Sequence, residues 1–453
     1  MVTSRSPRPR ALFVAYTFPP VGGAGVQRTT KFVKYLPYAG WDASVLTVSN
    51  PSVPVRDVSL CGDVPSSTTV VRARTFEPSY ATKTALMNGG SGSPGSRRLK
   101  HALHRAVVAL LQPDPQILWS VPAFVAGMRA LRRTRHDAIV ATAPPFSSLL
   151  LGAALSRVSN VPLVLDYRDE WGVSNMHWEN RQLRGESMAL QRAMEKSALR
   201  RADAVVATSP RSALELKALI QEAGASAPVT HIFNGFDPED FPGDPAYPRP
   251  RSSSRRWRLV YTGTLYNLMS PEPLVQAVEM LAASRPDLAA QIDLVFAGRR
   301  AAEQARRLER IAGLCRLETH EYVSHGEAIA MMRSADALCL LLSDLPGADR
   351  VIPAKLFEYI ASRRPILTIA PPGDVWDLLQ AHPSAFTRTP RDVRGISEWL
   401  ARAIDGGVGA VAATEADTRA YNRRYQAERL ASLLDALVAA KPRGRRRVDR
   451  EAA

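Results

Sequence analysis

The sequence predicts an α/β protein with two domains, each built around a parallel sheet that helices cover on both faces. The chain has 453 residues, too many for one ordinary domain. Short, continuously apolar runs alternate with amphipathic segments, which is typical of buried parallel strands joined by helices. The alternation is interrupted near residue 236 and then restarts. We therefore expect two units of the same kind in one chain.

Composition limits the classes of function. Hydrophobic residues make up 45% of the chain and charged residues 23%, as in a globular protein. The three cysteines lie too far apart for a zinc site or a disulfide framework, so a reducing compartment fits. The apolar run at 11–16 is too short for a signal peptide, and no run approaches the roughly 18 apolar residues that cross a bilayer. We expect a cytoplasmic protein without a bound metal.

The formal net charge is +16, which suits nucleic acid, an anionic membrane or phosphorylated substrates as partners. No recognition helix, zinc finger or aromatic ribonucleoprotein pattern is present, so nucleic acid is not expected. A basic amphipathic segment at 96–111 places Leu99, Leu103, Val107 and Leu110 on one face. It either makes a peripheral contact with anionic lipid on the inner face of the cell membrane, or packs on its own domain with a solvated basic face.

Nine apolar runs are predicted to be buried strands. They are 12–16, 43–48, 138–141, 163–165 and 204–207 in the first half, and 259–262, 292–297, 337–342 and 366–369 in the second. Between about residues 50 and 116 the order is less regular. Five prolines at 236–256 indicate an exposed linker. The predicted divisions are a first domain at 1–235, this linker, a second domain at 257–413, a closing helix at 414–440 and a basic, solvated tail at 441–453.

Glycines and charged residues follow two strands of the first half. The turn that contains Gly22 and Gly23 precedes a helix, where backbone N–H groups can approach an anion, although a tight turn without a ligand also explains it. Arg168 and Asp169 belong to DYRDEW at 166–171. This density of charge predicts the wall of a ligand site, with a structural salt-bridge cluster as the alternative. The end of the preceding strand, 143–145, should lie beside it.

In the second half, similar signals follow a strand and open a helix. Gly263 and Thr264 end the strand at 259–262 and are expected to offer backbone and hydroxyl donors to a phosphate. The second signal is the start of a helix, where Pro353 suits the first helical position. The free N–H groups of that turn and the ammonium of Lys355 then predict an anion site. Glu358, about one turn on, either accepts hydrogen bonds from vicinal hydroxyls or complements the helix dipole.

Taken together, these segments resemble the retaining, GT-B-fold glycosyltransferases of family 4, especially the subgroup of polysaccharide and natural-product biosynthesis. The matching segments are FPPVGGAGVQR (18–28), KFVKYLPYAGW (31–41), TAPPFSSLLLG (142–152), LDYRDEW (165–171), FNGFD (233–237), YTGTLY (261–266) and PAKLFEYIASRRPIL (353–367). Each is weak alone, and the resemblance rests on their order over nearly the whole chain.

The resemblance implies two Rossmann-like domains whose sheets face an interdomain cleft, with the acceptor on the first domain and the nucleotide sugar on the second. It implies that the closing helix crosses back to the first domain. The base pocket is expected at residues 322–324, largely through backbone, and Glu358 is expected to hold the ribose. The donor site predicted in this way is Gly22, Gly23, Gly263, Thr264, Arg299, Tyr322, Val323, Arg350, Pro353, Ala354, Lys355, Leu356 and Glu358. The expected catalytic residues are Arg168, Asp169 and Lys355.

Two positions depart from the family pattern. The first glutamate of the family's pair falls at Arg350, which either binds sugar or phosphate charge or leaves Asp349 to take the acid's place. The basic residue expected after the first strand of the second domain is also missing, because residues 266–268 are Tyr-Asn-Leu. Lys355 or Arg299 would then supply that charge.

The expected reaction is transfer of a sugar from a nucleotide-diphosphate sugar to an acceptor, in cell-envelope polysaccharide, glycolipid or natural-product biosynthesis. The leaving diphosphate gains charge, which preorganised donors and cations must stabilise. No cofactor is expected beyond the sugar nucleotide, which is a substrate. The acceptor, lipid-linked or soluble, is not specified by the sequence. Two alternatives are a nucleotide-sugar epimerase of the same fold, and a non-catalytic scaffold subunit, which Arg350 in place of glutamate keeps open.

Overall fold

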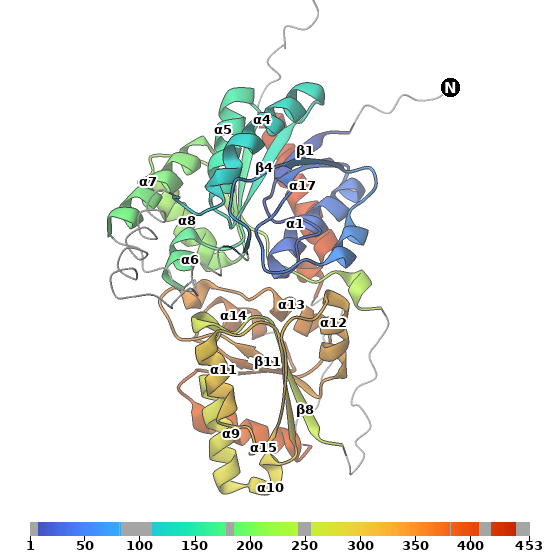
Figure 1. Cartoon of the computed structure of the whole chain (residues 1–453), viewed down its shortest axis with the longest axis vertical. Helices are drawn as coiled ribbons and strands as arrows, with labels where there is room; N and C mark the ends of the chain where they lie inside the picture. Colours follow the sequence, from blue (N-terminus) through green and yellow to red (C-terminus); the bar gives the residue numbers. More distant parts are fainter. Residues whose placement is uncertain are drawn as a thin grey trace, which may run out of the picture.

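The computed structural model describes residues 8–80, 82, 111–177, 185–242, 255–380, 382–406 and 418–440. Figure 1 shows two α/β domains placed one above the other along the long axis. The first contains a seven-stranded sheet and the second a six-stranded sheet, and every pair of neighbouring strands is parallel. The predicted class, with two parallel sheets, is therefore confirmed. Nearly all of the basic segment at 96–111, and the tail at 441–453, lie outside the described residues.

The first sheet has the order β3-β2-β1-β4-β5-β6-β7. Its strands are β1 (Arg10–Val14), β2 (Asp42–Val48), β3 (Thr69–Ala73), β4 (Ala138–Ala143), β5 (Leu163–Tyr167), β6 (Ala204–Ala207) and β7 (Val229–His231). Its helices are α1 (Ala24–Tyr35), α4 (Ile117–Arg133), α5 (Ser147–Ser159), α6 (Trp171–His177), α7 (Gly185–Arg201) and α8 (Pro210–Glu222). The strand order changes direction between β1 and β4, and ligands of such sheets bind beyond the carboxyl ends at this point.

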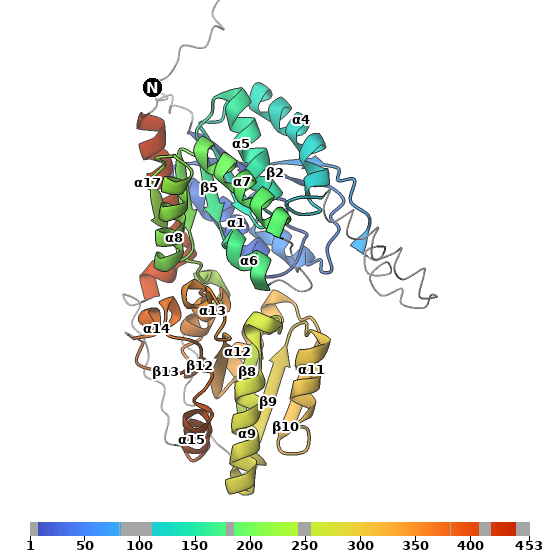
Figure 2. The ribbon, with the colours of Figure 1, turned by 90° about the vertical axis from the view of Figure 1, so that its left-hand side faces the viewer.

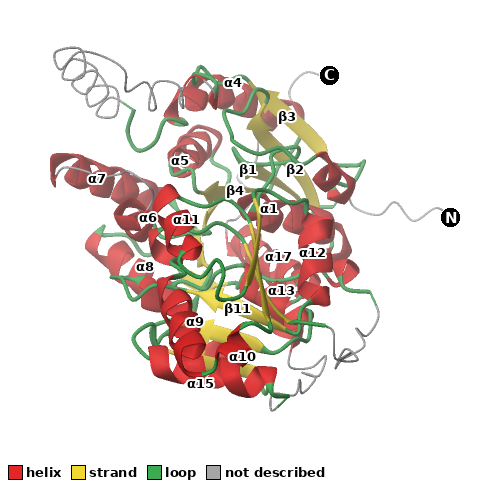
Figure 3. Cartoon of the chain, turned by 60° about the horizontal axis from the view of Figure 1, so that its bottom comes forward, coloured by secondary structure: helices red, strands yellow, loops and turns green. Residues whose placement is uncertain are grey.

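The second sheet repeats the plan with the order β10-β9-β8-β11-β12-β13. Its strands are β8 (Trp257–Thr262), β9 (Ile292–Ala297), β10 (Arg316–His320), β11 (Ala337–Leu341), β12 (Ile366–Ile369) and β13 (Ala385–Arg388). Its helices are α9 (Glu272–Ser284), α10 (Pro286–Ala289), α11 (Ala302–Glu309), α12 (His325–Ser334), α13 (Lys355–Ala361), α14 (Asp374–Leu379) and α15 (Val393–Ile404). Figure 3 shows helices flanking the strands of both sheets.

Each sheet is buried on both faces, which explains the continuous apolar strands. In β1, Leu12 and Val14 face one core, which α4, α5 and α7 complete. Ala11 and Phe13 point to the opposite face, because side chains alternate along a strand, and there they meet α1. The second sheet is likewise enclosed by two apolar clusters.

The last helix, α17 (Arg423–Ala440), completes the first domain. Its residues Leu430 and Leu434 share an apolar cluster with Phe32 of α1, and Asp435 accepts a hydrogen bond from the indole N–H of Trp41 at 2.9 Å. Figure 2 shows α17 running along the first domain with its N-terminal end beside the second. The chain therefore crosses between the domains twice, once before β8 and once before α17.

The two segments that cross between the domains, which we call the first and second crossing, are hydrogen-bonded to each other and to α1. Phe236 donates its N–H to the Tyr421 carbonyl at 3.0 Å and accepts from the Arg423 N–H at 3.0 Å. Beside this pair, Asp237 accepts hydrogen bonds from Lys31 Nζ at 2.6 Å and from the Tyr35 hydroxyl at 2.5 Å. Burial opposes ionisation of Asp237, but the charge of Lys31 and these hydrogen bonds outweigh it and hold its pKa well below the usual range.

A buried ion pair joins α1 to the middle of the first sheet. Arg28 is 1% exposed and Asp166, on β5, is 2% exposed. The guanidinium donates to Asp166 Oδ1 at 2.8 Å and to the carbonyls of Ile232 and Phe233, both at 2.9 Å. Thr142 of β4 adds a further hydrogen bond to Asp166 at 2.9 Å. This part of the DYRDEW segment is therefore structural.

Removing the Asp166 charge should leave Arg28 buried without a counterion. We expect Asp166→Asn to destabilise the first domain by about 3–5 kcal/mol, the usual cost of breaking a buried pair. Urea unfolding followed by circular dichroism measures it. Glu222→Gln, which removes a carboxylate from an exposed cluster with Arg192 and Lys196, is the matched control and should leave the midpoint nearly unchanged. Equal midpoints for both variants would contradict the structural role of the buried pair.

Candidate functional site

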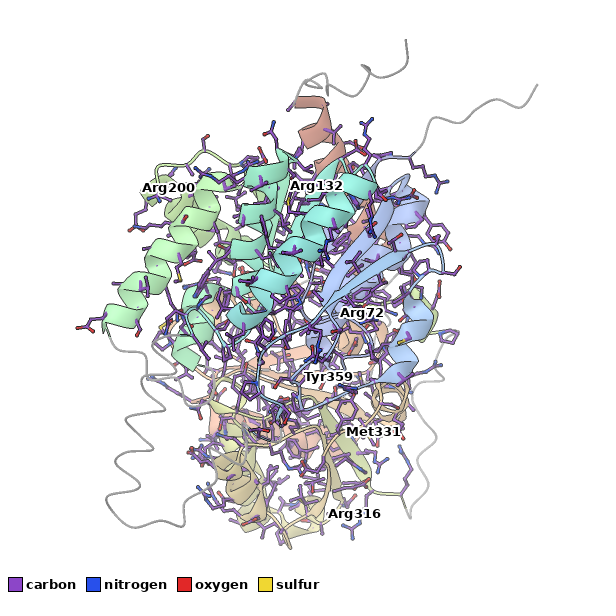
Figure 4. All side chains as sticks on the ribbon, turned by 45° about the horizontal axis from the view of Figure 1, so that its top comes forward. Arg72, Arg132, Arg200, Arg316, Met331 and Tyr359 are labelled. Carbon is purple, nitrogen blue, oxygen red and sulfur yellow. The ribbon has the colours of Figure 1, made fainter. Side chains whose placement is uncertain are left out.

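The carboxyl edges of the two sheets meet at the domain boundary. The hydroxyl of Tyr322, which follows β10, donates to Asp57 Oδ2 of the first domain at 3.2 Å. In Figure 4, Tyr359 of α13 lies close to this boundary, whereas Arg316, at the start of β10, lies at the far end of the second domain. Because ligands of open parallel sheets bind beyond the carboxyl ends of the strands, the loops after β1, β5, β8 and β10 and the start of α13 form one candidate site.

Lys355, the first residue of α13, is a partly exposed residue whose ammonium group forms no ion pair or hydrogen bond with any described residue. Its Nζ lies 3.7 Å from the centroid of the Tyr261 ring. A Cβ at Gly263, where φ is +120°, would lie 2.8 Å from this Nζ, so glycine leaves the space that the ammonium occupies. Burial lowers the pKa of Lys355 to about 7, although the charges of Cys339 and Glu358 oppose this. An anion bound here would restore the missing counterion.

The turn before Lys355 differs from the prediction. Helix α13 begins at Lys355 with Ala354 as its N-cap, so Pro353 does not occupy the first helical position. The N–H of Leu356 bonds to the Pro353 carbonyl at 3.0 Å, which closes a tighter i→i+3 turn ahead of the α-helix. The side chain of Leu356 is buried in the core. Pro353, Ala354 and Leu356 therefore position Lys355, and the candidate anion site depends on its ammonium group.

The turn after β8 also departs from expectation in one respect. The N–H of Gly263 donates to the Ala297 carbonyl at 2.7 Å and extends the sheet, so it is not the free phosphate donor that the sequence predicts. A Cβ at Gly298 would lie 2.2 Å from the Gly263 carbonyl oxygen, which leaves room only for glycine. The side chain of Thr264 is exposed beside this turn. Arg299 is partly exposed, and its guanidinium pairs with no carboxylate among the described residues.

Glu358, one turn along α13, lies among charges from several elements. The residue is partly exposed, and its carboxylate accepts no hydrogen bond from the described residues. Burial raises its pKa, the positive charges of His325 and Arg423 oppose this, and Asp240 adds to it. His325 Nε2 lies 2.9 Å from Asp240 Oδ2. A carboxylate without a donor, next to the residues after β10, is suited to accept hydrogen bonds from a ligand.

Tyr322 and Val323 follow β10, as predicted for the base pocket, but Tyr322 also links the domains. Its hydroxyl bonds to Asp57, and a Cβ at Gly22 would lie 3.1 Å from the same hydroxyl. Burial and the Asp57 charge raise the pKa of Tyr322 to about 12, so the hydroxyl stays protonated and can donate. The Gly22–Gly23 turn of the first domain therefore touches the second domain directly.

Arg350, at the position where the family pattern has glutamate, pairs with a carboxylate of the other domain. Its Nε lies 2.7 Å from Glu170 Oε2, and Glu170 follows β5 in the DYRDEW segment. The carbonyl of Arg350 accepts a hydrogen bond from Ser209 Oγ at 2.7 Å, and Ser212 Oγ donates to Glu170. Arg350 therefore joins the domains through its Nε and its carbonyl group.

Arg168 and Asp169 lie at the same edge of the first sheet but differ in environment. Arg168 is 7% exposed and donates to the carbonyls of Ala143 and Pro144, which confirms the predicted contact with the end of β4. Asp169 is exposed. The surrounding protein nevertheless raises the pKa of its carboxyl, and the charge of Arg168 opposes that shift. Asp169 is thus open to solvent beside a buried cation.

Metal ligands and membrane spans are absent from the described part of the chain. Among these residues, no group of His, Cys, Asp or Glu side chains is arranged to hold a metal ion. Within the same ranges no helix is both long and apolar enough to cross a bilayer. Cys315 and Cys339 are buried as free thiols in the core of the second domain.

Part of the sequence matches a known protein family, and the whole chain is similar in structure to several solved proteins. Residues 22–235 match the family model of the glycosyl transferase 4-like domain. The solved structure of Anabaena Alr3699/HepE in complex with UDP-glucose is 14% identical, covers 95% of this chain and 97% of that chain, and gives a TM-score of 0.53. The α,α-trehalose 6-phosphate synthase from Burkholderia multivorans is 12% identical over 96% of this chain and 99% of that chain, with a TM-score of 0.58.

A third similar structure is the apo form of the lipopolysaccharide outer core galactosyltransferase WaaB, 11% identical over 94% of this chain and 99% of that chain, with a TM-score of 0.53. No curated protein sequence matches the chain. At these identities the structures establish the fold, and the chain has the GT-B fold. The part of the chain before the linker is similar in sequence to glycosyl transferase 4-like domains.

Three contacts at the boundary were not predicted from the sequence. Glu170 lies beside Arg168 and Asp169 in the same segment, and its charge is opposite to that of Arg350, but opposite charge alone does not single out this pair in the sequence. The Tyr322–Asp57 bond had no such signal, because Asp57 lies in the irregular stretch after β2. The His325–Asp240 pair joins α12 to the first crossing and leaves no pattern in the sequence.

The Glu170–Arg350 pair should stabilise the contact between the domains. Replacing Glu170 with Gln removes a charged hydrogen bond, worth about 1.5–3 kcal/mol, so we expect the domains to separate more often. Small-angle X-ray scattering measures this as a larger radius of gyration. The exchanged pair, Glu170→Arg with Arg350→Glu, should restore the wild-type value, and Glu303→Gln, in an exposed pair within the second domain, should not change it. Identical scattering from the wild type and all three variants would refute a role for this pair.

Proposed function

We propose that the protein is a glycosyltransferase that moves a sugar from a nucleotide-diphosphate sugar to an acceptor hydroxyl, with retention of anomeric configuration. The observation that carries the proposal is the unpaired ammonium of Lys355 at the carboxyl edge of the second sheet, next to Tyr261 and Gly263. Similarity of residues 22–235 to glycosyl transferase 4-like domains supports it. So does the GT-B fold, which this chain shares with a structure that holds UDP-glucose.

In this proposal each side of the boundary has its own task. The bond between the anomeric carbon and the diphosphate oxygen breaks, a bond from that carbon to the acceptor oxygen forms, and the acceptor's proton passes to the diphosphate. Lys355 stabilises the charge that develops on the leaving diphosphate, as preorganised cations do in other active sites. Glu358 accepts hydrogen bonds from the ribose hydroxyls. Gly22 and Gly23 approach from the first domain, where Asp169 faces the acceptor.

The biological setting follows from the same resemblance and is part of the proposal. We place the enzyme in the cytoplasm, or at the inner face of the cell membrane, in the assembly of a cell-envelope polysaccharide, a glycolipid or a natural product. The acceptor is lipid-linked in the membrane case and soluble otherwise. Flotation of the intact protein with neutral and anionic vesicles at low salt separates the two cases, because attraction to anionic lipid is lost at high salt.

A donor-turnover assay tests the reaction itself. The protein is incubated with a panel of nucleotide sugars, and release of nucleoside diphosphate and the configuration of the sugar are followed by nuclear magnetic resonance. A transferase releases nucleoside diphosphate, slowly to water or faster to an acceptor, and gives a product with the donor's anomeric configuration. An epimerase yields the isomeric nucleotide sugar, and a scaffold subunit changes no donor. Either of the last two results would overturn the proposal.

Lys355→Met should lower turnover by roughly 10²-fold or more, by analogy with lost transition-state donors. The fold should persist, because the ammonium is paired with no carboxylate among the described residues. The measurement is kcat for nucleoside diphosphate release, with thermal unfolding as the check on folding. Arg306→Met, at an exposed position on α11, is a control that should retain full turnover. Wild-type turnover in Lys355→Met would move the phosphate site elsewhere.

Donor binding should be linked to protonation of Lys355. The pKa of Lys355 is lowered to about 7 in the free protein, and a bound diphosphate raises it. At pH 8 most of the free protein lacks this proton, so donor binding should take up about one proton per site. At pH 6 the proton is already present on Lys355, so proton uptake should approach zero. Calorimetry in buffers of different ionisation enthalpy measures the uptake. A nucleotide sugar is the right ligand, because its diphosphate has no group that titrates in this range.

The same titration with Lys355→Met provides the control. The variant lacks the titrating amine, so its proton uptake at pH 8 should disappear while any contribution from His325 stays. Uptake that is unchanged in the variant would assign the proton to another group and contradict the role of Lys355.

Glu358→Gln should weaken binding of the same donor by about 1.5–3 kcal/mol, the range for a hydrogen bond to a charged group. Folding should be nearly unchanged, because the carboxylate accepts no hydrogen bond from the described residues. Calorimetric titration gives the affinity. A donor affinity equal to that of the wild type would remove Glu358 from the ribose site.

A further inference from the structure

Arg423, the first residue of α17, is a buried cation that is held by a neutral side chain. The residue is 3% exposed, and its Nη1 donates to Gln426 Oε1 at 3.2 Å. The amide of Gln426 in turn donates to the Asn234 carbonyl at 2.8 Å. Burial lowers the pKa of Arg423 to about 9, so the guanidinium remains charged at neutral pH. Because no carboxylate among the described residues forms an ion pair with Arg423, its charge acts on groups farther away.

Three carboxylates interact with the charge of Arg423, and two of them already have a closer cation. The three are Glu358, Asp237 and Asp166. Asp166 pairs with Arg28 at 2.8 Å, and Asp237 lies within 2.9 Å of two lysine ammonium groups. Glu358 forms no ion pair and accepts no hydrogen bond among the described residues. Arg423 and Glu358 are therefore two buried, opposite charges that each lack a direct counterion in the described part of the chain.

Aromatic packing holds the start of α17 against α13, as Figure 2 shows for the two helices. The ring of Tyr421 lies 5.2 Å from the ring of Phe357, the residue before Glu358. Both rings also contact Phe233, which leads into the first crossing. The N–H of Arg423 donates to a carbonyl of that crossing at 3.0 Å. The position of Arg423 relative to Glu358 is therefore fixed by packing and by backbone hydrogen bonds.

Other titratable groups from four elements also face the Glu358 carboxylate. They are His325 of α12, Asp240 of the first crossing, Lys31 of α1, and Lys355 and Tyr359 of α13 itself. Burial lowers the pKa of His325, but its bond to Asp240 and the charge of Glu358 outweigh this and raise it. An imidazole nevertheless loses its charge as the pH rises, whereas Arg423 keeps its charge up to about pH 9. Arg423 is thus the cation that acts on Glu358 throughout the neutral range.

We propose that Arg423 is a positioning residue for the nucleotide: its charge keeps the carboxylate of Glu358 ionised, so that the carboxylate accepts hydrogen bonds from the ribose hydroxyls. This inference rests on the proposed function and adds a residue that acts through Glu358. An ionised carboxylate accepts hydrogen bonds through both oxygens, whereas a protonated one becomes a donor and loses part of its capacity to accept. Glu358 should therefore favour ribose over a sugar without hydroxyls only while it is ionised.

The ribose preference should depend on pH in a direction that the charges determine. It should be present at neutral pH and disappear as the pH falls through the pKa of Glu358. Burial raises that pKa, and the charge of Arg423 opposes the rise. Without the charge of Arg423 the pKa should rise by about one pH unit, a usual effect of a nearby opposite charge. The preference should then be lost at a higher pH.

Carbon-13 nuclear magnetic resonance of the intact, ligand-free protein with carboxyl-labelled glutamate measures this charge directly. The Glu358 signal is identified by its absence from Glu358→Gln. Arg423→Met should raise the pKa of Glu358 by about one pH unit. Arg423→Lys, which keeps a positive charge, should restore the wild-type value. Arg424→Met, at the exposed neighbouring position, is the matched control and should leave the pKa unchanged. Equal pKa values in the wild type and Arg423→Met would overturn the proposal, whatever the protein binds.

Binding of nucleotides with and without ribose hydroxyls tests the consequence for the ligand. The diphosphates of adenosine, guanosine, cytidine and uridine are each compared with their 2′,3′-dideoxy analogues by calorimetry over a range of pH. The wild type should bind the ribose form about tenfold or more tightly at neutral pH, the effect of a charged hydrogen bond. This ratio cancels what the diphosphate contributes. In Arg423→Met the ratio should approach one at a pH where the wild type and Arg424→Met still keep it.

A ribose preference that fades at the same pH in Arg423→Met and the wild type would contradict the proposal. Should Arg423→Met not fold, Arg423→Gln, which keeps a polar group beside Gln426, takes its place. If neither neutral variant folds while Arg423→Lys does, the charge serves folding and the proposal is overturned. If no nucleoside diphosphate binds, the proposed function fails, and the pKa of Glu358 alone decides whether Arg423 controls this carboxylate.

Discussion

Burying a positive charge requires acceptors or a carboxylate close by, and this requirement shapes the whole domain boundary. Arg28 is paired with Asp166, Lys31 with Asp237, and Arg350 with Glu170. The three pairs join α1 to the sheet, the first crossing to α1, and one domain to the other. Losing either partner of such a pair leaves an uncompensated charge, which is why they hold the architecture in place.

Several cations at the boundary have no carboxylate partner among the described residues. Buried Arg423 donates to Gln426, Arg168 donates to two carbonyl groups, and the ammonium of Lys355 has neither kind of partner. Lys355 and Arg168 lie at the carboxyl edges of the second and first sheets, and neither forms an ion pair with a described residue. Each is next to a glycine whose missing side chain leaves space, Gly263 in one case and Gly25 in the other. An anionic ligand between the domains would supply the counterion that Lys355 lacks.

The structure gives a physical reason for arginine at position 350, where the family pattern has glutamate. Arg350 of the second domain forms an ion pair with Glu170 of the first domain. The pair brings the end of β5 next to the turn before α13. The pair thereby joins the first domain, which carries Arg168, to the second domain, which carries Lys355.

The sequence predicts the central strands of both sheets well and the edge strands not at all. Strands such as β1 and β9 are buried along nearly their whole length and appear as continuous apolar runs. The four strands that were missed, β3, β7, β10 and β13, are the edges of the two sheets. They contain polar, partly exposed residues such as Arg72, Thr230 and Glu318, so their pattern is that of a loop.

The candidate site, like the fold, was predicted only in part. Residues that follow central strands were found, because glycine and charge after an apolar run are visible in the sequence. Which of them are already occupied was not visible: the Gly263 N–H is used within the sheet, and Asp166 is used by Arg28. Contacts between distant segments, such as Tyr322 with Asp57, depend on the relative position of the domains.

Hydrogen–deuterium exchange with and without a bound nucleotide sugar tests the central claim most directly, namely that one ligand occupies both sheet edges at the domain boundary. The account predicts slower exchange in three places together: the turn and first helix of the first domain at 22–28, the turn at 263–266, and the start of α13 at 354–358. Exchange in these segments requires local opening of the backbone, and a ligand that holds all three segments suppresses that opening. Protection confined to one domain, or absent from α13, would contradict the account.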